Sequence, residues 1–553
     1  MHKRKWYRRW WFYVLAGIVL LLGSGIIYLY CVAIVYPPEI VDKSALQLQR
    51  VEVSPGFYTI GNNWFRKSKS GLFEMYTEGK PFELGVINGK LSRELVVRQE
   101  DHFNAQIRKM IPSDFYLNFL KYFVAWFNRH LAENVTEEDK EEIYGISESA
   151  SDQYQYIGSN YQRILNYHAA HDIGHALQSM ALVGCTSFAT WGPKSEGGTL
   201  ITGRNFDFYV GDAFAQDKIV AFEKPDQGYK FMTVTWGGFI GAVSGMNEKG
   251  LAVTINAAKS GIPSGSATPV SLVAREILQY AKNISEAYAI AGKRKMFVSE
   301  SFLISSAEDH KAVIVEKTPD SLGMYDPQTD FIICANHFQS DQLKGSLPNK
   351  LQMEESASPY RYERVQELLN ALDTNTVAKT VALLRDQRGL MNADLGMGNE
   401  KAVNQLIAHH SIVFEPEKRL VWVSTAPWQL GPYVAYDLNK IFSMHGLQTD
   451  HELVVDSLTV PADSFLTSDA YRNFVQFRNL KMRMMDGMSV DPDSLVLLNP
   501  SYYHAYVLAG DYLFKKKEFV NARNFYEQAL KREIATKKEE NYIRAQIELC
   551  KKK

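Results

Sequence analysis

Two short stretches of sequence decide how this chain folds: Val183-Gly-Cys-Thr-Ser-Phe-Ala189 and, after it, Gly203-Arg-Asn-Phe-Asp-Phe208. On its own, a cysteine between glycine and threonine is more often a small buried apolar residue than a catalyst. A hairpin that starts at Cys185 and returns at a glycine turn would bring Arg204 and Asp207 towards the thiol. Because a guanidinium lowers the pKa of a thiol and a carboxylate can orient an amine, Cys185 is a candidate nucleophile.

Composition limits the alternatives. The 553 residues hold 61 Lys+Arg and 62 Asp+Glu, a net charge of −1, so the chain lacks the basic field that nucleic-acid binding requires. With 46% apolar and 22% charged residues, most of it is expected to fold, in about three or four units by length. The four cysteines, Cys31, Cys185, Cys334 and Cys550, are too few and too scattered for a disulfide framework or a CxxC-type zinc site.

The amino terminus predicts a membrane anchor. Residues 1–9 are basic and residues 10–38 are uncharged, which is long enough to cross a bilayer and longer than the apolar core of a cleavable signal. The positive-inside rule keeps residues 1–9 in the cytoplasm and places the rest outside it, in the periplasm if the cell is bacterial. A lipoprotein anchor through Cys31 is the weaker alternative, because Tyr30 is bulky where a small residue is needed.

Hydrophobic periodicity divides the remainder. Residues 45–184 read as an α-rich leader, and residues 185–445 as antiparallel strand clusters with helices between them, an α+β layered sandwich. Residues 446–496 form a connecting segment. Residues 497–553 resemble a tetratricopeptide (TPR) helix pair, which needs a partner surface to bury its own apolar face; the small and aromatic residues behind that reading are Gly510, Ala522, Tyr526 and Ala529.

Five segments together resemble a known family. They are, in chain order, Gly79–Gly85, Gly184–Thr186, Gly203–Asp207, Gly245–Asn256, and the pair Cys334–Phe338 and Ser358–Arg364. This order is similar to the N-terminal-nucleophile (Ntn) hydrolases, specifically the autoproteolytic acyl-coenzyme A:6-aminopenicillanic acid acyltransferase-like family, which is related to choloylglycine hydrolase. The resemblance spans roughly residues 79 to 430 and leaves the anchor and the tail uncovered.

The resemblance implies a four-layer αββα sandwich and self-cleavage between Gly184 and Cys185. The α-amine freed at Cys185 would then act as the base for its own thiol, with no cofactor and no metal. It also implies one role for each further site residue: Asp207 holds the amine, Arg204 favours the thiolate, Asn256 donates to the oxyanion, Asn336 contacts the substrate amide and the amine, and Arg361 belongs to a polar network that supports processing.

Other kinds of site are weaker readings. His168, His171 and His175 share one helical face at ligand-like spacing, but the segment has no HExxH glutamate, so a packed polar helix face is favoured over a metal site. A papain-like pairing of Cys185 with a histidine would leave the Gly-Arg-Asn-x-Asp stretch unexplained. Neither a Gly-x-Ser-x-Gly elbow nor a phosphate-binding loop with Gly-Lys-Ser/Thr occurs in the chain.

The sequence thus predicts a membrane-anchored, self-processing cysteine amidohydrolase or N-acyltransferase, acting on a linear amide or acyl thioester through a Cys185 acyl-enzyme. The leader and core chains are expected to stay associated, and the tail to be available for a protein partner. The alternative is an inactive Ntn-fold scaffold that uses the tail to bind proteins. The sequence leaves open the acyl chain, the amine, the choice between water and an amine as acceptor, the oligomeric state and the extent of self-cleavage.

Overall fold

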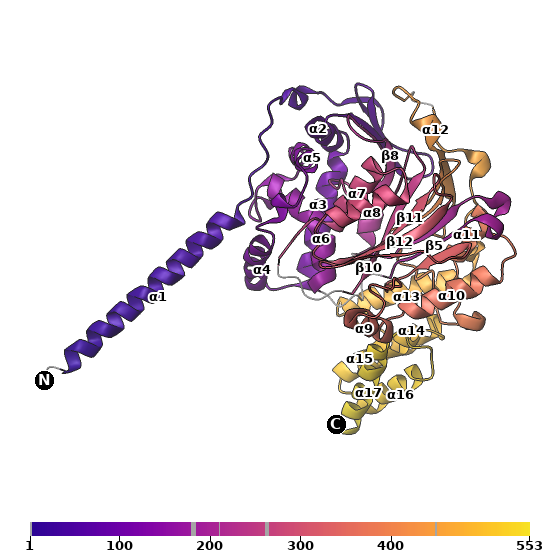
Figure 1. The fold of residues 1–553 in the computed structure, drawn as a ribbon. Coiled ribbons are helices and arrows are strands. Elements are labelled where there is room, and N and C mark those ends of the chain that lie inside the picture. Colours follow the sequence, from indigo (N-terminus) through magenta and orange to yellow (C-terminus); the bar gives the residue numbers. More distant parts are fainter. Residues whose placement is uncertain (1–2, 178–183, 209–210, 260–264, 448–450) are drawn as a thin grey trace.

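The computed structural model describes residues 3–177, 184–208, 211–259, 265–447 and 451–553. Two β-sheets form its centre, one of eleven strands and one of six (Figure 1). Neighbouring strands in both sheets are antiparallel except β4 and β7, which run parallel. The α+β class predicted from the sequence is therefore confirmed.

The larger sheet has the strand order β1-β2-β3-β4-β7-β8-β9-β10-β11-β12-β13. Its strands are β1 (Val51–Ser54), β2 (Phe57–Ile60), β3 (Asn63–Lys67), β4 (Phe73–Gly79), β7 (Ile219–Pro225), β8 (Phe231–Thr235), β9 (Ser244–Asn247), β10 (Leu251–Ala258), β11 (Ser299–Ser306), β12 (Lys311–Lys317) and β13 (Leu322–Tyr325). The leader thus supplies four strands, which the sequence reading did not predict, and β4 joins them to the core through β7.

The smaller sheet has the order β14-β5-β6-β15-β16-β17 and carries the segment that begins at Cys185. Its strands are β5 (Thr186–Thr190), β6 (Ile201–Phe206), β14 (Phe331–Cys334), β15 (His410–Glu415), β16 (Leu420–Ser424) and β17 (Tyr433–Asp437). The β5–β6 hairpin pairs Ser187 with Arg204 and Thr186 with Asn205, so the chain returns beside Cys185 as the hairpin prediction requires.

Apolar side chains hold the two sheets face to face. One cluster joins Phe222 and Met246 of the larger sheet to Ile412 and Val423 of the smaller. On the outer face of the larger sheet lie α7 (Val270–Tyr280) and α8 (Ile284–Lys293), and on that of the smaller lie α10 (Ser358–Asn370) and α11 (Val377–Leu384). Burial of both faces of each sheet supplies the main driving force for folding the core.

The described part of the leader adds five α-helices to its strands: α2 (Pro81–Leu91), α3 (Arg93–Met110), α4 (Asp114–Phe127), α5 (Glu137–Ser147) and α6 (Asn160–Leu177). Helices α2 and α5 cross so closely that a Cβ placed on Gly85 would lie 2.0 Å from the Glu142 carbonyl oxygen. Any larger residue at that position would force the helices apart. Ser113 and Thr136 cap α4 and α5 with their side-chain oxygens.

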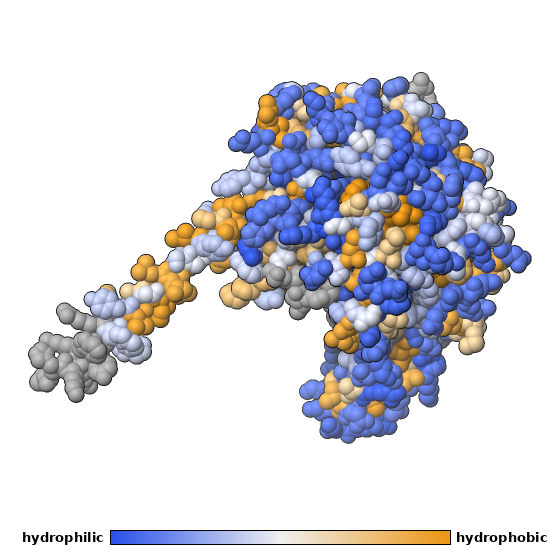
Figure 2. All heavy atoms as spheres, viewed as in Figure 1, coloured by the Kyte–Doolittle hydropathy of each residue, from blue (hydrophilic) through white to orange (hydrophobic). Residues whose placement is uncertain are grey.

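Helix α1 (Lys3–Ala33) extends away from the body (Figure 1). Within it, Trp10–Val32 is long and apolar enough to cross a membrane, and none of that stretch is buried against the protein. Figure 2 shows apolar residues along this helix. Length and composition agree with the predicted anchor, whereas the orientation across a membrane stays a prediction.

The tail packs as a helical appendix below the sheets (Figure 1). The tail contributes α15 (Tyr503–Lys515), α16 (Phe519–Ala529) and α17 (Lys537–Lys551), and the connecting segment before it contributes α13 (Asp469–Met485) and most of α14 (Pro492–Leu498). Helices α9 (Leu347–Glu355) and α12 (Leu438–Ile441) belong to the core region. In the appendix, Gly510 of α15 lies against the Tyr526 ring of α16, where an added Cβ would come within 2.7 Å. The likeness to a TPR unit, and all of the domain boundaries given above, stay predictions.

Candidate active site

Four consecutive residues lie at the centre of the site, and each contacts a different predicted site residue. Gly184 lies against Asp207, Cys185 against Arg204, Thr186 against Arg361 and Ser187 against Asn256. This arrangement follows from the β5–β6 hairpin and from the neighbouring end of β10, which together surround the start of β5.

Arg204 is the polar partner of the candidate nucleophile. Its Nη2 atom lies 3.7 Å from the Cys185 Sγ atom and donates to the Ile255 carbonyl oxygen at 2.6 Å. Its Nη1 atom donates to the Val243 carbonyl at 3.0 Å and to the Ser244 hydroxyl. Strand β6 directs this side chain between the sheets, and the carbonyl contacts fix the guanidinium beside the sulfur.

Asp207 and Gln405 enclose Gly184. The Gly184 backbone N–H donates to the Asp207 carbonyl oxygen at 3.0 Å, and the Gln405 Nε2 atom donates to the Gly184 carbonyl oxygen at 2.8 Å. The same Nε2 atom lies 3.4 Å from the Asp207 Oδ2 atom. The peptide group that precedes Cys185 is therefore held at both its N–H and its C=O.

Arg361 links three segments around Thr186. Its Nε atom donates to the Thr186 hydroxyl at 3.1 Å, its Nη2 to the Asn336 Oδ1 at 2.7 Å and its Nη1 to the Glu400 carbonyl at 2.8 Å. Asn336 in turn donates through Nδ2 to the Ala257 carbonyl at 2.9 Å. Arg361 therefore ties the start of β5 to the ends of β14 and β10.

Asn256 occupies the last part of β10, next to Ile255. Its Oδ1 atom accepts from the Ser187 hydroxyl at 2.9 Å, and its Nδ2 atom donates to the Cys334 carbonyl at 3.0 Å. The amide that the family resemblance assigns to an oxyanion is thus hydrogen-bonded to Ser187 and Cys334 in this structure. One hydrogen of its NH2 group is left to serve another acceptor.

Burial controls the charges at this site. It raises the pKa of the Cys185 thiol to about 11 despite the opposing effect of Arg204, so the thiol is protonated at neutral pH. Burial also raises the pKa of Asp207 to about 7, with Arg361 and Arg204 opposing it. Asp207 can therefore exchange a proton near neutrality.

The structure brings all the predicted catalytic residues around one segment and adds three that the sequence reading missed: Gln405, Ser187 and Glu300. Glu300 on β11 is buried, neither of its carboxyl oxygens has a hydrogen-bond partner among the described residues, and burial raises its pKa well above the ordinary value. No motif marks Gln405 or Glu300, because each meets the site only through the tertiary fold. Ser187 could have been found from the alternation of β5, which sends it to the same face as Cys185.

In the described part of the chain, His168 makes structural contacts with the backbone. The His168 ring is placed by both nitrogens: Nδ1 lies 2.8 Å from the Ile164 carbonyl and Nε2 accepts from the Ile240 N–H at 2.9 Å. The side chains of His171 and His175 lie outside the described residues. The partner of Cys185 Sγ there is Arg204 and no histidine, and no group of three or more His, Cys, Asp or Glu in that part is placed to hold a metal ion.

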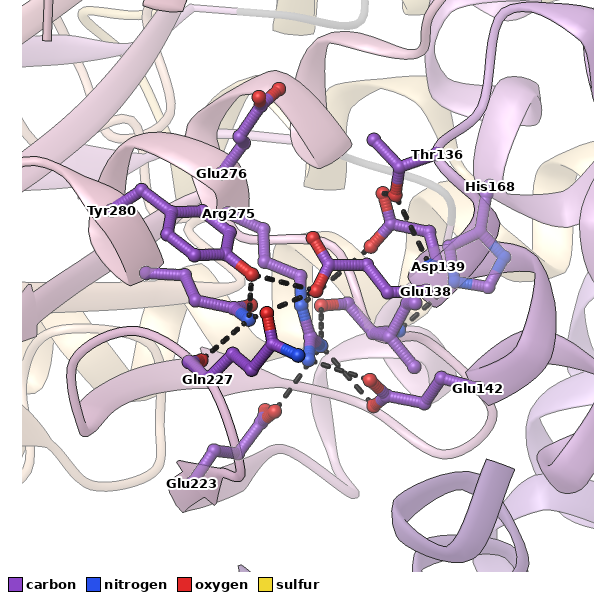
Figure 3. Close-up of polar contacts among 12 residues, drawn as sticks. Thr136, Glu138, Asp139, Glu142, His168, Glu223, Gln227, Arg275, Glu276 and Tyr280 are labelled. Atoms are coloured by element: carbon purple, nitrogen blue, oxygen red, sulfur yellow. Dashed lines mark hydrogen bonds and ion pairs between the residues drawn. The ribbon is translucent and has the colours of Figure 1, made fainter. Parts of the chain in front are cut away.

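A buried cluster of charges joins the leader to the core (Figure 3). Arg275 of α7 donates to both carboxylate oxygens of Glu142 on α5, at 3.2 and 2.6 Å, and lies 3.2 Å from Glu223 of β7. Asp139, also on α5, lies 3.8 Å away. Burial raises the pKa values of all three acids, that of Asp139 to about 6, and the Arg275 guanidinium, which lowers them, offsets this effect only in part.

Comparison with known families identifies the region around this site. Residues 194–427 match the family model described as acyl-coenzyme A:6-aminopenicillanic acid acyl-transferase, which confirms the resemblance predicted from the five segments. The matched range includes Arg204, Asp207, Asn256, Asn336 and Arg361, and it begins after Cys185.

Curated relatives are distant. An uncharacterized protein of Archaeoglobus fulgidus is 22% identical over 340 residues, covering 54% of this chain and 55% of that one. Protein dcd1B of Dictyostelium discoideum is 22% identical over 276 residues, covering 46% of this chain and 52% of that one. The chain thus spans about half the length of the curated relatives it matches.

Similar solved structures include a Caenorhabditis elegans ortholog of N-acylethanolamine-hydrolyzing acid amidase, with 17% identity and a TM-score of 0.31 over 42% of this chain and 93% of that chain. A conjugated bile acid hydrolase of Clostridium perfringens has 15% identity and a TM-score of 0.32, over 49% of this chain and 95% of that chain. Penicillin V acylase of Agrobacterium tumefaciens has 16% identity and a TM-score of 0.31, over 46% of this chain and 87% of that chain. Scores this low support no functional argument.

Proposed function

We propose, from the acyltransferase-family match of residues 194–427 and from the surroundings of Cys185, that this chain is a self-processing cysteine enzyme of the Ntn type. It hydrolyses a linear amide or transfers its acyl group, and its two facing sheets with helices on their outer faces are the four-layer αββα sandwich of that class. The observation that carries the proposal is that Gly184, Cys185, Thr186 and Ser187 each lie against a different polar group of the site.

Maturation begins when the Cys185 Sγ atom adds to the Gly184 carbonyl carbon. The S–C bond forms, the carbonyl electron pair moves onto oxygen, and the C–N bond then breaks to leave a thioester and a free Cys185 amine. The thiol proton passes to the departing nitrogen, and Asp207, whose pKa is raised to about 7, is suited to carry it. Water hydrolyses the thioester, which leaves a Gly184 carboxylate and regenerates the thiol.

After cleavage the new α-amine, with an ordinary pKa near 8, becomes the base for the thiol. Asp207 holds that amine, and Arg204, 3.7 Å from the sulfur, stabilises the thiolate. Asn256 donates to the oxyanion that forms when the substrate carbonyl is attacked, and Asn336 contacts the substrate amide. Water or an amine then takes the acyl group from Cys185.

Intact mass measurement of the purified full chain tests maturation. Two associated fragments, residues 1–184 and 185–553, are expected for the wild type, and one continuous chain for Cys185→Ala. The matched control is Cys334→Ala, since Cys334 is buried in the adjacent strand with a pKa raised by burial and should leave processing intact. A continuous wild-type chain would show that the proposed maturation is wrong.

The substrate follows from location. Residues 10–38, which include most of helix α1, would anchor the chain with its amino terminus in the cytoplasm, so the enzyme would meet extracytoplasmic or membrane-derived amides. The names of the similar structures suggest a panel of N-acylethanolamines, bile-acid conjugates and penicillin V. Turnover of each should be measured with and without amine acceptors, which separates hydrolysis from transfer.

The alternative, an inactive scaffold, draws support from a groove of about 480 Å³ on the tail, bordered by Val490, Tyr512, Lys516, Asn521 and Phe525. A scaffold would leave Cys185 unlabelled by electrophilic amide or β-lactam probes, and would recover a protein partner only when residues 505–553 are present. Labelling that is lost in Cys185→Ala would reject this alternative.

A further inference from the structure

We propose that Gln405 is the oxyanion donor of self-cleavage, a role for which neither the sequence nor the comparisons mark any residue. The inference rests on the proposed maturation and names a group that acts in it. The Gln405 Nε2 atom donates to the Gly184 carbonyl oxygen at 2.8 Å, and this oxygen becomes negatively charged when Cys185 attacks. A side-chain amide at this distance is a known means of stabilising such a charge.

The surroundings fix Gln405 in that position. The side chain is buried, and the Gln405 Nε2 atom also lies 3.4 Å from the Asp207 Oδ2 atom, so the carboxylate orients the amide N–H groups. A Cβ added to Gly184 would come within 2.4 Å of Nε2, which shows how closely the amide packs on the scissile peptide. Glycine at position 184 therefore admits the donor.

Two oxyanion positions follow from this assignment. Asn256 is engaged by Ser187 and Cys334 and serves the substrate oxyanion, whereas Gln405 serves the oxyanion at Gly184. Once the Gly184–Cys185 bond is cut, the new carboxylate has no further need of a donor. Loss of Gln405 should thus slow the cleavage of the Gly184–Cys185 bond, which is the step to measure.

The test is a cell-free synthesis and chase of full-length chains in lipid nanodiscs, with continuous and cut chains quantified by mass. Gln405→Leu should slow cleavage by about 10²- to 10³-fold, and Gln405→Asn should also slow it because the shorter amide falls short of the carbonyl. The control is Gln429→Leu, since Gln429 is equally buried and its amide has no hydrogen-bond partner among the described residues. A thermal unfolding midpoint close to the wild type in Gln405→Leu excludes misfolding as the cause.

The outcomes separate the two proposals. If the wild type stays continuous, self-cleavage itself is wrong and the Gln405 role falls with it. If the wild type cuts and Gln405→Leu cuts at the same rate, only the Gln405 role is wrong. Slow cleavage in Gln405→Leu with normal cleavage in Gln429→Leu supports it.

A second, independent observation concerns α4, whose aromatic residues face outwards. Phe115, Phe119 and Tyr122, spaced along one face of the helix, are 85%, 61% and 60% exposed. Helix α4 packs beside α1, and Val35, just beyond α1, packs on the same apolar cluster as Trp126. We infer that this aromatic face of α4 sits in the bilayer surface, at the end of the span formed by α1.

Position and chemistry favour lipid as the occupant. The membrane-length stretch of α1 ends at Val32, and α4 packs beside α1. This inference rests on α1 being the anchor, in which case α4 lies at the level of the lipid headgroups. Tyrosine prefers that region because its ring is apolar and its hydroxyl reaches water. Phenylalanine is typical of the apolar face of helices that lie in the bilayer surface. The helix is also held firmly by the core, because the Phe127 carbonyl accepts from Ser266 at 3.1 Å.

Photocrosslinking of the full chain in phosphatidylcholine/phosphatidylglycerol liposomes tests this. Benzoylphenylalanine is placed singly at Leu20 in α1, at Phe119, and at Leu497 of α14, which is 78% exposed and serves as the matched control. Lipid adducts are expected at Leu20 and Phe119, with at least a tenfold lower yield at Leu497. Lipid adducts at Leu20 alone would refute the inference that α4 lies in the bilayer surface. Crosslinks between two copies of the chain at Phe119 would refute it too. If no lipid adduct forms at Leu20, the membrane anchor is refuted as well.

Discussion

Replacing Arg275 by leucine is the sharpest test of how the leader is held on the core. Arg275 is 2% exposed, and its guanidinium contacts Glu142, Glu223 and Asp139. Its Nη1 atom also donates to the Ile240 carbonyl at 2.9 Å. Removing one member of a buried ion pair costs about 3–5 kcal/mol, because the remaining charge is left unpaired in a dry site.

The cost should depend on pH. The three acids have pKa values raised by burial, so in the wild type their contribution to stability is present below the ordinary carboxyl pKa and is lost as pH rises through the folded values, about 6 for Asp139. Without the guanidinium these acids protonate more readily. We therefore expect Arg275→Leu to destabilise the protein by about 4 kcal/mol at pH 8 and by about half as much at pH 5.

Urea unfolding of the full chain in detergent, followed by tryptophan fluorescence at both pH values, gives the free-energy differences. The matched control is Arg294→Leu, which breaks a two-bond pair with Glu276 at 2.6 and 2.7 Å that is partly open to solvent, at a cost of about 1 kcal/mol or less. The reasoning fails if Arg275→Leu costs no more than Arg294→Leu, or if its cost is equal at pH 5 and pH 8.

Three other outcomes are expected. The self-cleavage rate should rise with pH through about 7, the pKa of Asp207, and the Asp207→Asn variant should cleave itself slowly at every pH. A wild-type rate that is flat from pH 5 to 9 would contradict the role of Asp207 as proton carrier. Arg361→Lys, which loses the fork that joins Thr186 to Asn336, should slow cleavage about tenfold in the same chase, and wild-type speed would show that the network is dispensable. Gly510→Val should destabilise the tail by about 1–3 kcal/mol because its Cβ meets the Tyr526 ring, and limited proteolysis should release residues after 500 sooner than in the wild type.

Much of the core was predictable because its signals are local. The hairpin that starts at Cys185 and the antiparallel strands with helices between them after residue 185 are present as the sequence predicts, since alternation and helical periodicity arise within a few residues. Strands β1–β4 were not predicted: they lie in a region read as mostly helical and gain their stability from the distant β7, which pairs with β4. Propensity within a short window does not record such a partner.

The sequence by itself indicated Cys185 as the candidate nucleophile, the hairpin that carries Arg204 and Asp207, and the order of the family segments, because these residues lie close in the chain or in motifs of fixed spacing. Only the tertiary structure decided that Gln405 reaches the Gly184 carbonyl and that one arginine of α7 serves three acids from α5 and β7. Such contacts join residues far apart in the chain with no periodicity between them. They exist because the two sheets and the leader helices pack in one arrangement, and burial there also sets the pKa values on which the proposed chemistry depends.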